Sequence, residues 1–315
     1  MLSVGVDIGG TKVAIGVVDQ HGQIVEKRLF ATNLEDPASI AQGIASHCTD
    51  LAQVYDISGI GIASAGFVNA DRKTIDFSAN IPWDMHYPLA ARIAEHTHCD
   101  VPIVVENDGN AAGWAEFRFG AGQGSSSMLM LTIGTGLGGA IILDHHLVRG
   151  SYGMAAEVGH MRLVPGGHYC GCGHEGCWET YASGSALVKR ARFAAIAHPS
   201  RAGTLLDMAG GKPKKITGPM VTTAAQEGDG LAIELLAELG SWLGQGAASV
   251  ASLLDIETIV IGGGVCEAGD LLLEPARHAF MKALPAAEAR TAARIELAQA
   301  RNDAGMIGAA DLALR

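Results

Sequence analysis

Three cysteines and one histidine in the middle of the chain have the residue types and spacing of a metal site. His160, Cys170, Cys172 and Cys177 form an H-x9-C-x-C-x4-C pattern. Three thiolates and one imidazole complete a tetrahedral set for Zn²⁺ and leave no open position for catalysis. We therefore predict a structural zinc that fixes a glycine-rich loop, and with it the two flanking carboxylates, Glu157 and Glu179. Free buried thiols are the alternative interpretation.

A second candidate site lies at the start of the chain, where Asp7 ends an apolar run and is followed by Gly9, Gly10, Thr11 and Lys12. Glycines let backbone N–H groups approach phosphate oxygens closely, and the threonine adds a hydroxyl donor. A carboxylate here is suited to hold Mg²⁺ through water, because magnesium gives up its hydration shell reluctantly. The lysine either offers charge to a transferring phosphoryl group or is an ordinary solvated side chain.

A similar turn occurs later at Gly134, Thr135 and Gly136, within a stretch that resembles the first one. Residues 4–19 and 128–144 both run from an apolar strand through a small-residue turn into a second apolar strand and end at an aspartate. We interpret this as a duplicated domain in which each half offers one phosphate loop to a shared cleft. Two unrelated hairpins are the alternative, because glycine-rich turns between strands are common.

Neither loop has the G-x-x-x-x-G-K-[ST] spacing of a P-loop. The run from Gly134 to Gly139 is close to a dinucleotide-binding pattern, but strand-like residues 140–143 follow it instead of a helix. A third glycine run, Gly262, Gly263 and Gly264, ends an apolar strand, where a nucleotide's adenosine could lie against bare backbone. A plain strand-to-helix turn is the alternative.

Asp108 is the residue that we expect to carry catalysis. It follows the apolar strand pattern of residues 102–106 and precedes a helical pattern over 110–119. A strand that ends in this way delivers its last side chains into a crevice, where a carboxylate can act as a general base. Aspartate is also a favoured helix N-cap, so a capping role is the alternative interpretation.

The remaining pattern alternates strands and helices, which predicts an α/β fold with helices covering mixed sheets. Helical spacing is present over 37–52, and further strands are predicted over 57–63 and 256–261. Segment 222–254 is apolar but contains Gly240, Gly244 and Gly246, so we expect two or more packed helices. We expect segment 199–219 to be an exposed loop.

Composition narrows the function classes. The chain has 315 residues, of which 48% are hydrophobic and 17% charged, and its net charge is −11. These values are typical of a packed globular protein with room for two domains. The acidic balance argues against nucleic acid or an anionic membrane as the main partner. No signal peptide or membrane-spanning run is visible, and six cysteines suit a reduced cytoplasm.

Five motifs in this order resemble the ROK family of sugar kinases, and within it the ATP-dependent glucokinases of bacteria. They are the zinc pattern and the stretches 7–12, 105–112, 133–139 and 261–264. The resemblance implies a two-lobed, actin-like (ribonuclease-H-like) fold. Its small lobe would comprise residues 1–108 and 304–315, and its large lobe, with the zinc and adenosine sites, residues 109–303.

The resemblance also implies the roles of site residues. Asn80, Asn107 and Asp108 would hold the distal sugar hydroxyls, and Glu157, His160 and Glu179 those near the anomeric carbon. His160 would bind zinc through one ring nitrogen and donate to the sugar through the other. Gly66 would let backbone approach the sugar, or is a plain turn glycine. Gly262, Gly263 and Gly264 would contact the adenosine.

The activity implied is phosphorylation of glucose by ATP and Mg²⁺, and the enzyme would be a homodimer or homotetramer. N-acetylmannosamine kinase, N-acetylglucosamine kinase, fructokinase and glucomannokinase share the motifs, and polyphosphate is an alternative phosphoryl donor. Sugar-sensing repressors of the family carry a helix-turn-helix domain before the first motif. Only six residues precede Asp7 here, so we expect no DNA-binding role.

Overall fold

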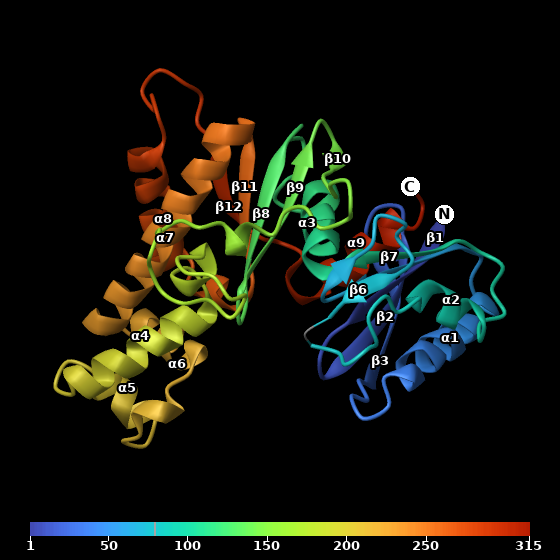
Figure 1. Cartoon of the computed structure of the whole chain (residues 1–315), viewed down its shortest axis with the longest axis horizontal. Coiled ribbons are helices and arrows are strands. Elements are labelled where there is room, and N and C mark those ends of the chain that lie inside the picture. The colour runs from blue at the N-terminus through green and yellow to red at the C-terminus, as the bar shows by residue number, and fades with distance from the viewer. Residues whose placement is uncertain (79) are drawn as a thin grey trace. The chain divides into compact units, whose positions relative to one another are not determined.

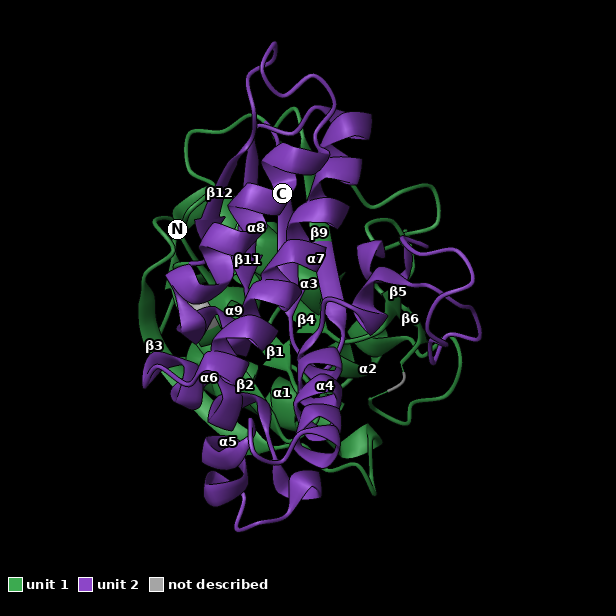
Figure 2. Cartoon of the chain, turned by 90° about the vertical axis from the view of Figure 1, so that its left-hand side faces the viewer, with its two compact units in different colours: residues 1–126, 140–156, 299–315 green, residues 127–139, 157–298 purple. Residues whose placement is uncertain are grey.

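The chain divides into two units by the contacts among its residues. The computed structural model describes residues 1–78 and 80–315, and of residue 301 only the backbone. Residues 1–126, 140–156 and 299–315 form the first unit, and residues 127–139 and 157–298 form the second (Figure 2). The lobe boundaries implied by the family resemblance stay a prediction.

The first sheet is organised around β1 (Leu2–Ile8), the buried run that opens the chain. β1 pairs antiparallel with β2 (Lys12–Asp19) and parallel with β4 (Ile57–Ser64). The strand order is β3-β2-β1-β4-β7, so that β3 (Ile24–Ala31) and β7 (Ile103–Asn107) are the outer strands (Figure 1). The predicted strands over 57–63 and 102–106 are therefore confirmed as β4 and β7.

A second sheet repeats this order. Its strands run β10 (His146–Leu147), β9 (Leu137–Leu143), β8 (Met128–Ile133), β11 (Thr258–Gly262) and β12 (Arg294–Leu297). β11 is parallel to both β8 and β12, as β4 is parallel to both β1 and β7. The hairpin β8–β9 thus has the place of β1–β2, and the duplication predicted from the two glycine turns is confirmed as a shared strand order.

The two faces of β1 contact different partners because side chains alternate along a strand. Val4, Val6 and Ile8 are buried in one apolar core with residues of α1 (Ala38–Ala52) and α2 (Leu89–Ala94). Gly5, between them, faces α9 (Ala304–Leu312), since a Cβ added there would lie 1.9 Å from the carbonyl oxygen of Met306.

The C-terminal helix α9 packs through glycines on several elements of the first unit. A Cβ added at Gly61 of β4 would lie 1.8 Å from the carbonyl oxygen of Ala309. One added at Gly308 would lie 1.8 Å from the carbonyl oxygen of Ala111, in α3 (Asp108–Phe119). These positions have no room for a side chain, so α9 approaches both β4 and α3 backbone to backbone.

In the second unit, the prediction of two or more packed helices over 222–254 is confirmed, but the expected break at the glycines is wrong. α6 (Gly218–Gln226) and α7 (Gly230–Leu254) are separate helices, but α7 runs unbroken through Gly240, Gly244 and Gly246. The first two provide room for α8 (Asp270–Ala283), because an added Cβ would lie 2.4 Å and 2.2 Å from its backbone carbonyl oxygens. Close packing of α7 on α8 offsets the low helix propensity of glycine.

Segment 199–219 is not purely a loop, because it contains α5 (Gly203–Met208) and a 3-10 turn, η3 (Pro213–Lys215). The buried side chains of Leu205 and Ile216 anchor this segment. The polar residues between them made the whole segment look like a loop in the sequence. The remaining elements are β5 (Phe67–Val68), β6 (Ile75–Phe77), α4 (Gly184–Ala197), and the 3-10 turns η1 (Val158–His160), η2 (Trp178–Thr180), η4 (Gly264–Ala268) and η5 (Arg301–Asp303).

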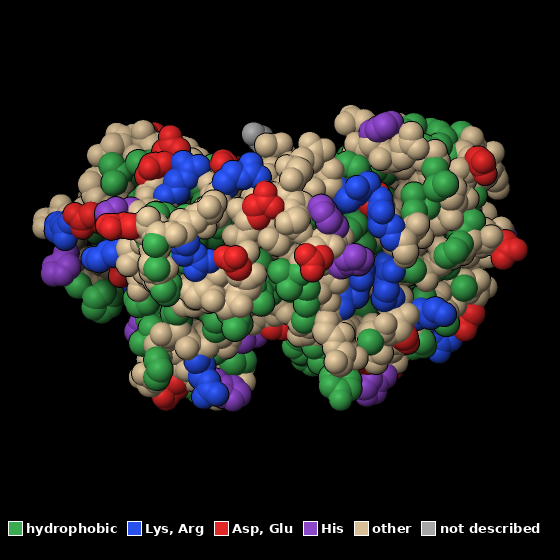
Figure 3. Space-filling model, turned by 90° about the horizontal axis from the view of Figure 1, so that it is seen from above, with side chains coloured by type: hydrophobic (Ala, Val, Ile, Leu, Met, Phe, Trp, Pro, Cys, Tyr) green, Lys and Arg blue, Asp and Glu red, His purple; other side chains and the backbone are tan. Residues whose placement is uncertain are grey.

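Within the described residues, the helices are all too short or too polar to cross a bilayer. Acidic and basic side chains are interspersed on the face drawn in Figure 3. The net charge of −11 is therefore not gathered into one acidic patch there, and a charged ligand on that face would meet local groups of both signs.

Candidate functional site

In the first unit, the predicted phosphate turn joins β1 to β2. Gly9 donates its N–H to the carbonyl oxygen of Lys12 at 3.0 Å, and the hydroxyl of Thr32 donates to the carbonyl oxygen of Gly9 at 2.6 Å. Gly10, Thr11 and Lys12 are exposed at the tip. A Cβ added at Gly10 would meet no atom within 4 Å, so open space lies beside this backbone.

Asp7 lies at the base of this turn in an acidic environment. Burial and the charges of Asp108 and Asp303 raise the pKa of its carboxyl to about 6, against the opposing charges of Lys12 and Lys27. Bringing a divalent cation to this carboxylate would relieve the repulsion among the acids, and oxygen ligands are those that Mg²⁺ prefers. The donor set therefore fits magnesium, with Asp7 the residue that would hold it.

Asn107, and not Asp108, is the N-cap of α3. Its side-chain oxygen accepts the N–H of Asn110 at 3.0 Å, and its amide donates to the carbonyl oxygen of Gly66 at 3.0 Å. The capping interpretation of Asp108 is therefore wrong, and its carboxylate is not needed to end the helix. Gly66 has φ +121°, and a Cβ there would lie 2.3 Å from the carbonyl oxygen of Phe77, so the turn itself requires glycine.

Asp108 is the first residue of α3, and its side chain is open to solvent. Enough protein nevertheless surrounds its carboxylate that desolvation raises the pKa, although a 2.9 Å hydrogen bond from the N–H of Gly109 acts in the opposite direction. Because a base works best when its pKa approaches the working pH, a raised value suits a general base that must remain accessible to substrate. Asn80, also predicted to contact the sugar, is exposed between β6 and α2.

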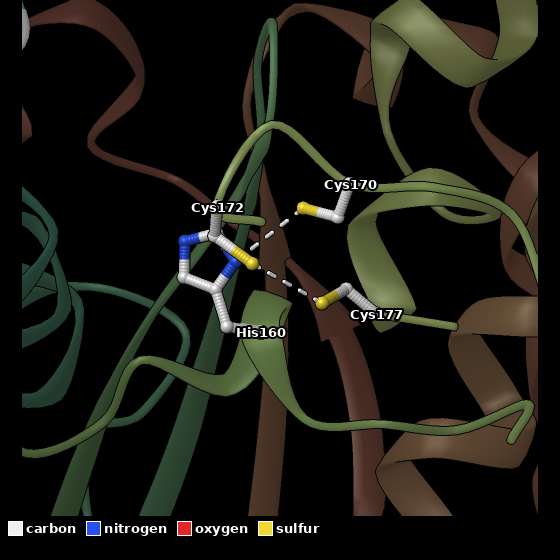
Figure 4. Close-up of side chains that lie close together, drawn as sticks. All are labelled: His160, Cys170, Cys172 and Cys177. Atoms are coloured by element: carbon white, nitrogen blue, oxygen red, sulfur yellow. Dashed lines mark hydrogen bonds between the residues drawn. The ribbon is translucent and has the colours of Figure 1, made fainter. Parts of the chain in front are cut away.

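In the second unit, the predicted zinc ligands come together. The ligand atoms of His160, Cys170, Cys172 and Cys177 all lie within 4.8 Å of one another (Figure 4). Sγ of Cys170 is 3.8 Å from Nδ1 of His160, and Sγ of Cys172 is 3.6 Å from that of Cys177. Tetrahedral zinc, with bonds of about 2.3 Å to sulfur and about 2.0 Å to nitrogen, would separate its ligands by about 3.5 to 3.8 Å. The cluster therefore fits Zn²⁺.

The three sugar-binding candidates of this unit cluster around the same loop. Nδ1 of His160 faces the sulfurs, and the other ring nitrogen lies on the outer side of the ring (Figure 4). Oε1 of Glu179 is 3.7 Å from Nδ1 of His160 and 3.0 Å from Sγ of Cys170. Glu157 is exposed, and its carbonyl oxygen accepts the N–H of His160 at 3.1 Å.

Trp178 fixes the backbone of Glu179. The indole is fully buried, and its N–H donates to the carbonyl oxygen of Trp242 in α7 at 2.8 Å. The ring lies over Gly246, where an added Cβ would be 2.1 Å from an indole carbon. The anchored ring restrains the backbone that carries the Glu179 carboxylate, which suits a group that selects among sugar hydroxyls.

Two of the predicted nucleotide loops line one cavity of about 840 Å³ in the second unit. Gly134, Thr135 and Gly264 contribute to its wall. Gly262 and Gly263 do not line it: a Cβ would meet the Met130 side chain at the first and the carbonyl oxygen of Ile133 at the second, where φ is +97°. Both glycines therefore have a packing reason of their own, and their contact with adenosine stays a prediction.

Another wall of this cavity is formed by α4, which the sequence patterns did not indicate. Its lining side chains there are Ser185, Val188, Lys189, Arg192, Phe193 and Ile196. Phe193 and Ile196 are 70% and 66% exposed, although both are large and apolar. An apolar pair displayed at i and i+3 on a helix was a signal available in the sequence, but without the fold nothing connects it to a glycine loop.

An adjoining cavity of about 340 Å³ connects this wall with the sugar candidates. Thr135, Ser185 and Lys189 line both cavities, and the smaller one also includes Gly136 and Glu179. Within the second unit, a continuous path thus runs from Gly264, past the glycine turn, to the carboxylate beside the zinc cluster. A phosphate chain placed along this path would meet the hydroxyl-bearing Thr135 and Ser185 and the cationic Lys189.

Comparison with known proteins assigns the family. The model of the ROK family matches residues 3–315. The chain belongs to the ROK family. It is 44% identical over 312 residues to a glucokinase of Streptomyces coelicolor, with 99% of this chain and 97% of the relative covered. An N-acetylmannosamine kinase of Yersinia pestis is 33% identical over 306 residues, covering 96% and 95%.

Solved ROK structures share the fold. The crystal structure of a ROK family glucokinase from Streptomyces griseus, in complex with glucose and AMPPNP, has a TM-score of 0.86 and 44% identity, covering 100% of this chain and 99% of that one. The predicted family and the mixed α/β sugar kinase fold are therefore confirmed. The roles of individual site residues in this ROK chain stay predictions.

Proposed function

We propose that this protein phosphorylates glucose at the expense of ATP and yields glucose 6-phosphate. The observation that carries the proposal is the 44% identity to a ROK glucokinase that has been crystallised with glucose and AMPPNP, over essentially the full length of both chains. The cavity lined by Gly134, Thr135 and Gly264 supports it, because its size suits a nucleotide.

In this proposal Asp108 is the general base. Its carboxylate accepts the proton of the sugar hydroxyl while that oxygen attacks the γ-phosphorus in line. Mg²⁺, when bound, would neutralise charge on the ATP phosphates. Asp7 holds the cation, and the backbone and hydroxyl of Thr11 and Thr135 orient the phosphates. Lys12 and Lys189 add positive charge where the overall field of the chain is acidic.

Sugar recognition falls to Asn80, Asn107 and Asp108 in the first unit and to Glu157, His160 and Glu179 in the second. Carboxylates and amides accept from neutral hydroxyls without requiring a charged ligand. His160, Cys170, Cys172 and Cys177 would bind Zn²⁺ that supports these groups and takes no part in the transfer. Gly66 would let the backbone approach the sugar, although its turn requires glycine in any case.

A nucleotide is favoured over polyphosphate as the phosphoryl donor. Val188, Phe193, Ile196 and Val265 give the larger cavity a wide apolar wall. A flat purine base buries apolar surface there, whereas a polyphosphate chain has no apolar part to place against it. A bound purine would cover Phe193 and Ile196 and so explain why two large apolar side chains are exposed without it.

N-acetylmannosamine kinase is the second candidate, because a relative with that name is 33% identical. Glu157 and Glu179 suit free hydroxyls at the first and second sugar carbons, which favours unmodified glucose.

We further propose that the protein is a homodimer or homotetramer, because of its family resemblance. We also propose that it works in a reducing compartment such as the cytoplasm, which suits the free thiols.

A coupled kinetic assay decides among these functions. The purified full chain is given ATP with glucose, mannose, fructose, N-acetylglucosamine or N-acetylmannosamine, and separately glucose with polyphosphate. We expect the highest kcat/KM with glucose and ATP. A higher value for an N-acetylated sugar would move the assignment to the second candidate, and turnover of none of these sugars would refute the kinase assignment.

A further inference from the structure

Glu106 is a buried carboxylate that the proposed chemistry does not use. It precedes Asn107 at the end of β7, and its residue is 3% exposed. Oε2 is 2.6 Å from Nε of Arg149, and Nε of Arg72 is 3.9 Å from the same oxygen. A buried charge is retained only where partners compensate its desolvation. The Glu106 carboxylate and the Arg149 guanidinium must therefore keep their relative positions closely.

The other oxygen of Glu106 holds the start of α3. Oε1 accepts the side-chain amide of Asn110 at 3.0 Å and the backbone N–H of Asn107 at 3.2 Å. Asn110 is itself 2% exposed and closes the N-cap with Asn107. Asp108 lies between these two contacts in the sequence. The Glu106 carboxylate therefore hydrogen-bonds the residues before and after Asp108, at Asn107 and Asn110, and restrains the turn that carries the proposed base.

Arg149 brings a second segment to this carboxylate. Its carbonyl oxygen accepts the N–H of Ala155 at 3.0 Å, which closes the loop 149–155. Within that loop Gly153 lies against the β5 hairpin, because an added Cβ would be 2.2 Å from the carbonyl oxygen of Val68. The guanidinium therefore comes from a packed segment, and it fixes the carboxylate that in turn fixes the helix start.

We propose that Glu106 and Arg149 are positioning residues that set the orientation of the Asp108 carboxylate. The inference rests on the proposed function, since it assigns a role within the same site. Arg149 restrains one oxygen of Glu106, so that the other can hold the turn Asn107–Asn110 in a single arrangement. Transfer to a sugar hydroxyl depends on this arrangement, because a displacement of about 1 Å at a reacting group can cost about 100-fold in rate.

Four variants separate positioning from simple stability. Glu106→Gln keeps an acceptor for the turn but loses the ion pair, and Arg149→Met removes the cation with similar length. The double variant E106Q/R149M removes both charges of the pair, while Arg72 keeps its hydrogen bonds to the carbonyl oxygens of Leu312 and Arg315. Glu116→Gln is the matched control, because Glu116 is equally buried at the other end of α3, where it accepts the N–H groups of Gln299 and Ala300 at 2.8 Å and 2.6 Å.

Each variant is measured for kcat, for the KM values of glucose and ATP, for Tm, and for amide hydrogen exchange of residues 103–112. We expect the two single variants to lower kcat about 10- to 100-fold. The KM for ATP should stay within about threefold, and exchange at residues 107–110 should accelerate. In the double variant Tm should recover while kcat stays low. Glu116→Gln should lower Tm without lowering kcat.

Recovery of kcat together with Tm in the double variant would show that the pair only stabilises the fold, and would overturn the proposal. An equal loss of kcat in Glu116→Gln would do the same. If Glu106→Gln does not fold, the proposal is tested by Arg149→Met alone, through its kcat and its amide hydrogen exchange at residues 107–110. If the unaltered enzyme phosphorylates no hexose, the proposed function fails instead, and hydrogen exchange still tests whether the pair orders the turn.

Discussion

The Sγ atom of Cys170 lies 3.0 Å from Oε1 of Glu179, so a predicted zinc ligand touches a predicted sugar ligand. As a thiol, Cys170 donates a hydrogen bond to that carboxylate. A zinc-bound thiolate has no proton to donate, so metal binding would leave both Glu179 oxygens to other donors such as sugar hydroxyls. Zinc content and sugar affinity should therefore change together.

Cys170→Ser tests this coupling. We expect the variant to lose its one Zn²⁺ per chain, to unfold at a lower temperature, and to show a KM for glucose raised on the order of 10-fold. Elemental analysis, thermal unfolding and the coupled assay measure these effects. Cys99→Ser is the control, because that half-buried thiol lies outside the cluster. Full zinc content in Cys170→Ser would contradict the assignment of the site.

Asp108→Asn keeps the shape of the side chain but removes the base. We expect kcat to fall about 100- to 10,000-fold, with the Kd for glucose changed only a few-fold. Because desolvation raises the pKa of Asp108, activity of the unaltered enzyme should decline on the acid side at a pH above that of an ordinary aspartate. Asp144→Asn, at the exposed β9–β10 turn, serves as control. Substantial turnover by Asp108→Asn would remove it as the base.

Asp7→Asn should stabilise the metal-free protein at neutral pH. The folded pKa of Asp7 is about 6 against an ordinary 3.8, so the folded state loses stability as pH rises from about 4 to 6 and the carboxyl ionises. The asparagine variant escapes that loss, which is worth about 1 to 3 kcal/mol for a group partly open to solvent. Urea unfolding without Mg²⁺ should show the gain at pH 8 and none below pH 4. An equal gain at both would point to packing instead of charge.

Activity provides the second measurement on Asp7→Asn. The variant should need more Mg²⁺ for half-maximal turnover, because it has lost the carboxylate proposed to hold the cation. Titration of Mg²⁺ at saturating ATP measures this. An unchanged magnesium requirement would leave the electrostatic prediction intact but would remove Asp7 as the metal-holding residue.

The sequence was sufficient wherever chemistry and spacing were local. His160, Cys170, Cys172 and Cys177 converge as their pattern predicts, since ligands within one short loop need no knowledge of the fold. The repeated hairpins predicted the repeated strand order for the same reason. Local patterns of this kind constrain the structure directly.

The prediction failed where distant segments decide the structure. Glycines within residues 230–254 suggested breaks, but α8 and Trp178 fill the space above them and the helix continues. The choice between Asn107 and Asp108 as N-cap could not be made from propensity, because both are favoured caps. The α4 wall of the nucleotide cavity depends on how α4 packs beside the turn 134–136, which no local pattern encodes.

Gly246→Ala should reveal how strongly the sugar-binding loop depends on α7. The added methyl group would lie 2.1 Å from the Trp178 indole, which is fully buried and fixed by its hydrogen bond to Trp242 and so has little room to move. We expect a loss of about 1 to 3 kcal/mol in the free energy of unfolding. The KM for glucose should rise as well, because Glu179 follows the displaced ring. Gly230→Ala is the matched control, since it begins the same helix and a Cβ there meets no atom within 4 Å. Equal effects of the two substitutions on stability and KM would mean that α7 tolerates the methyl group and that Trp178 does not position Glu179.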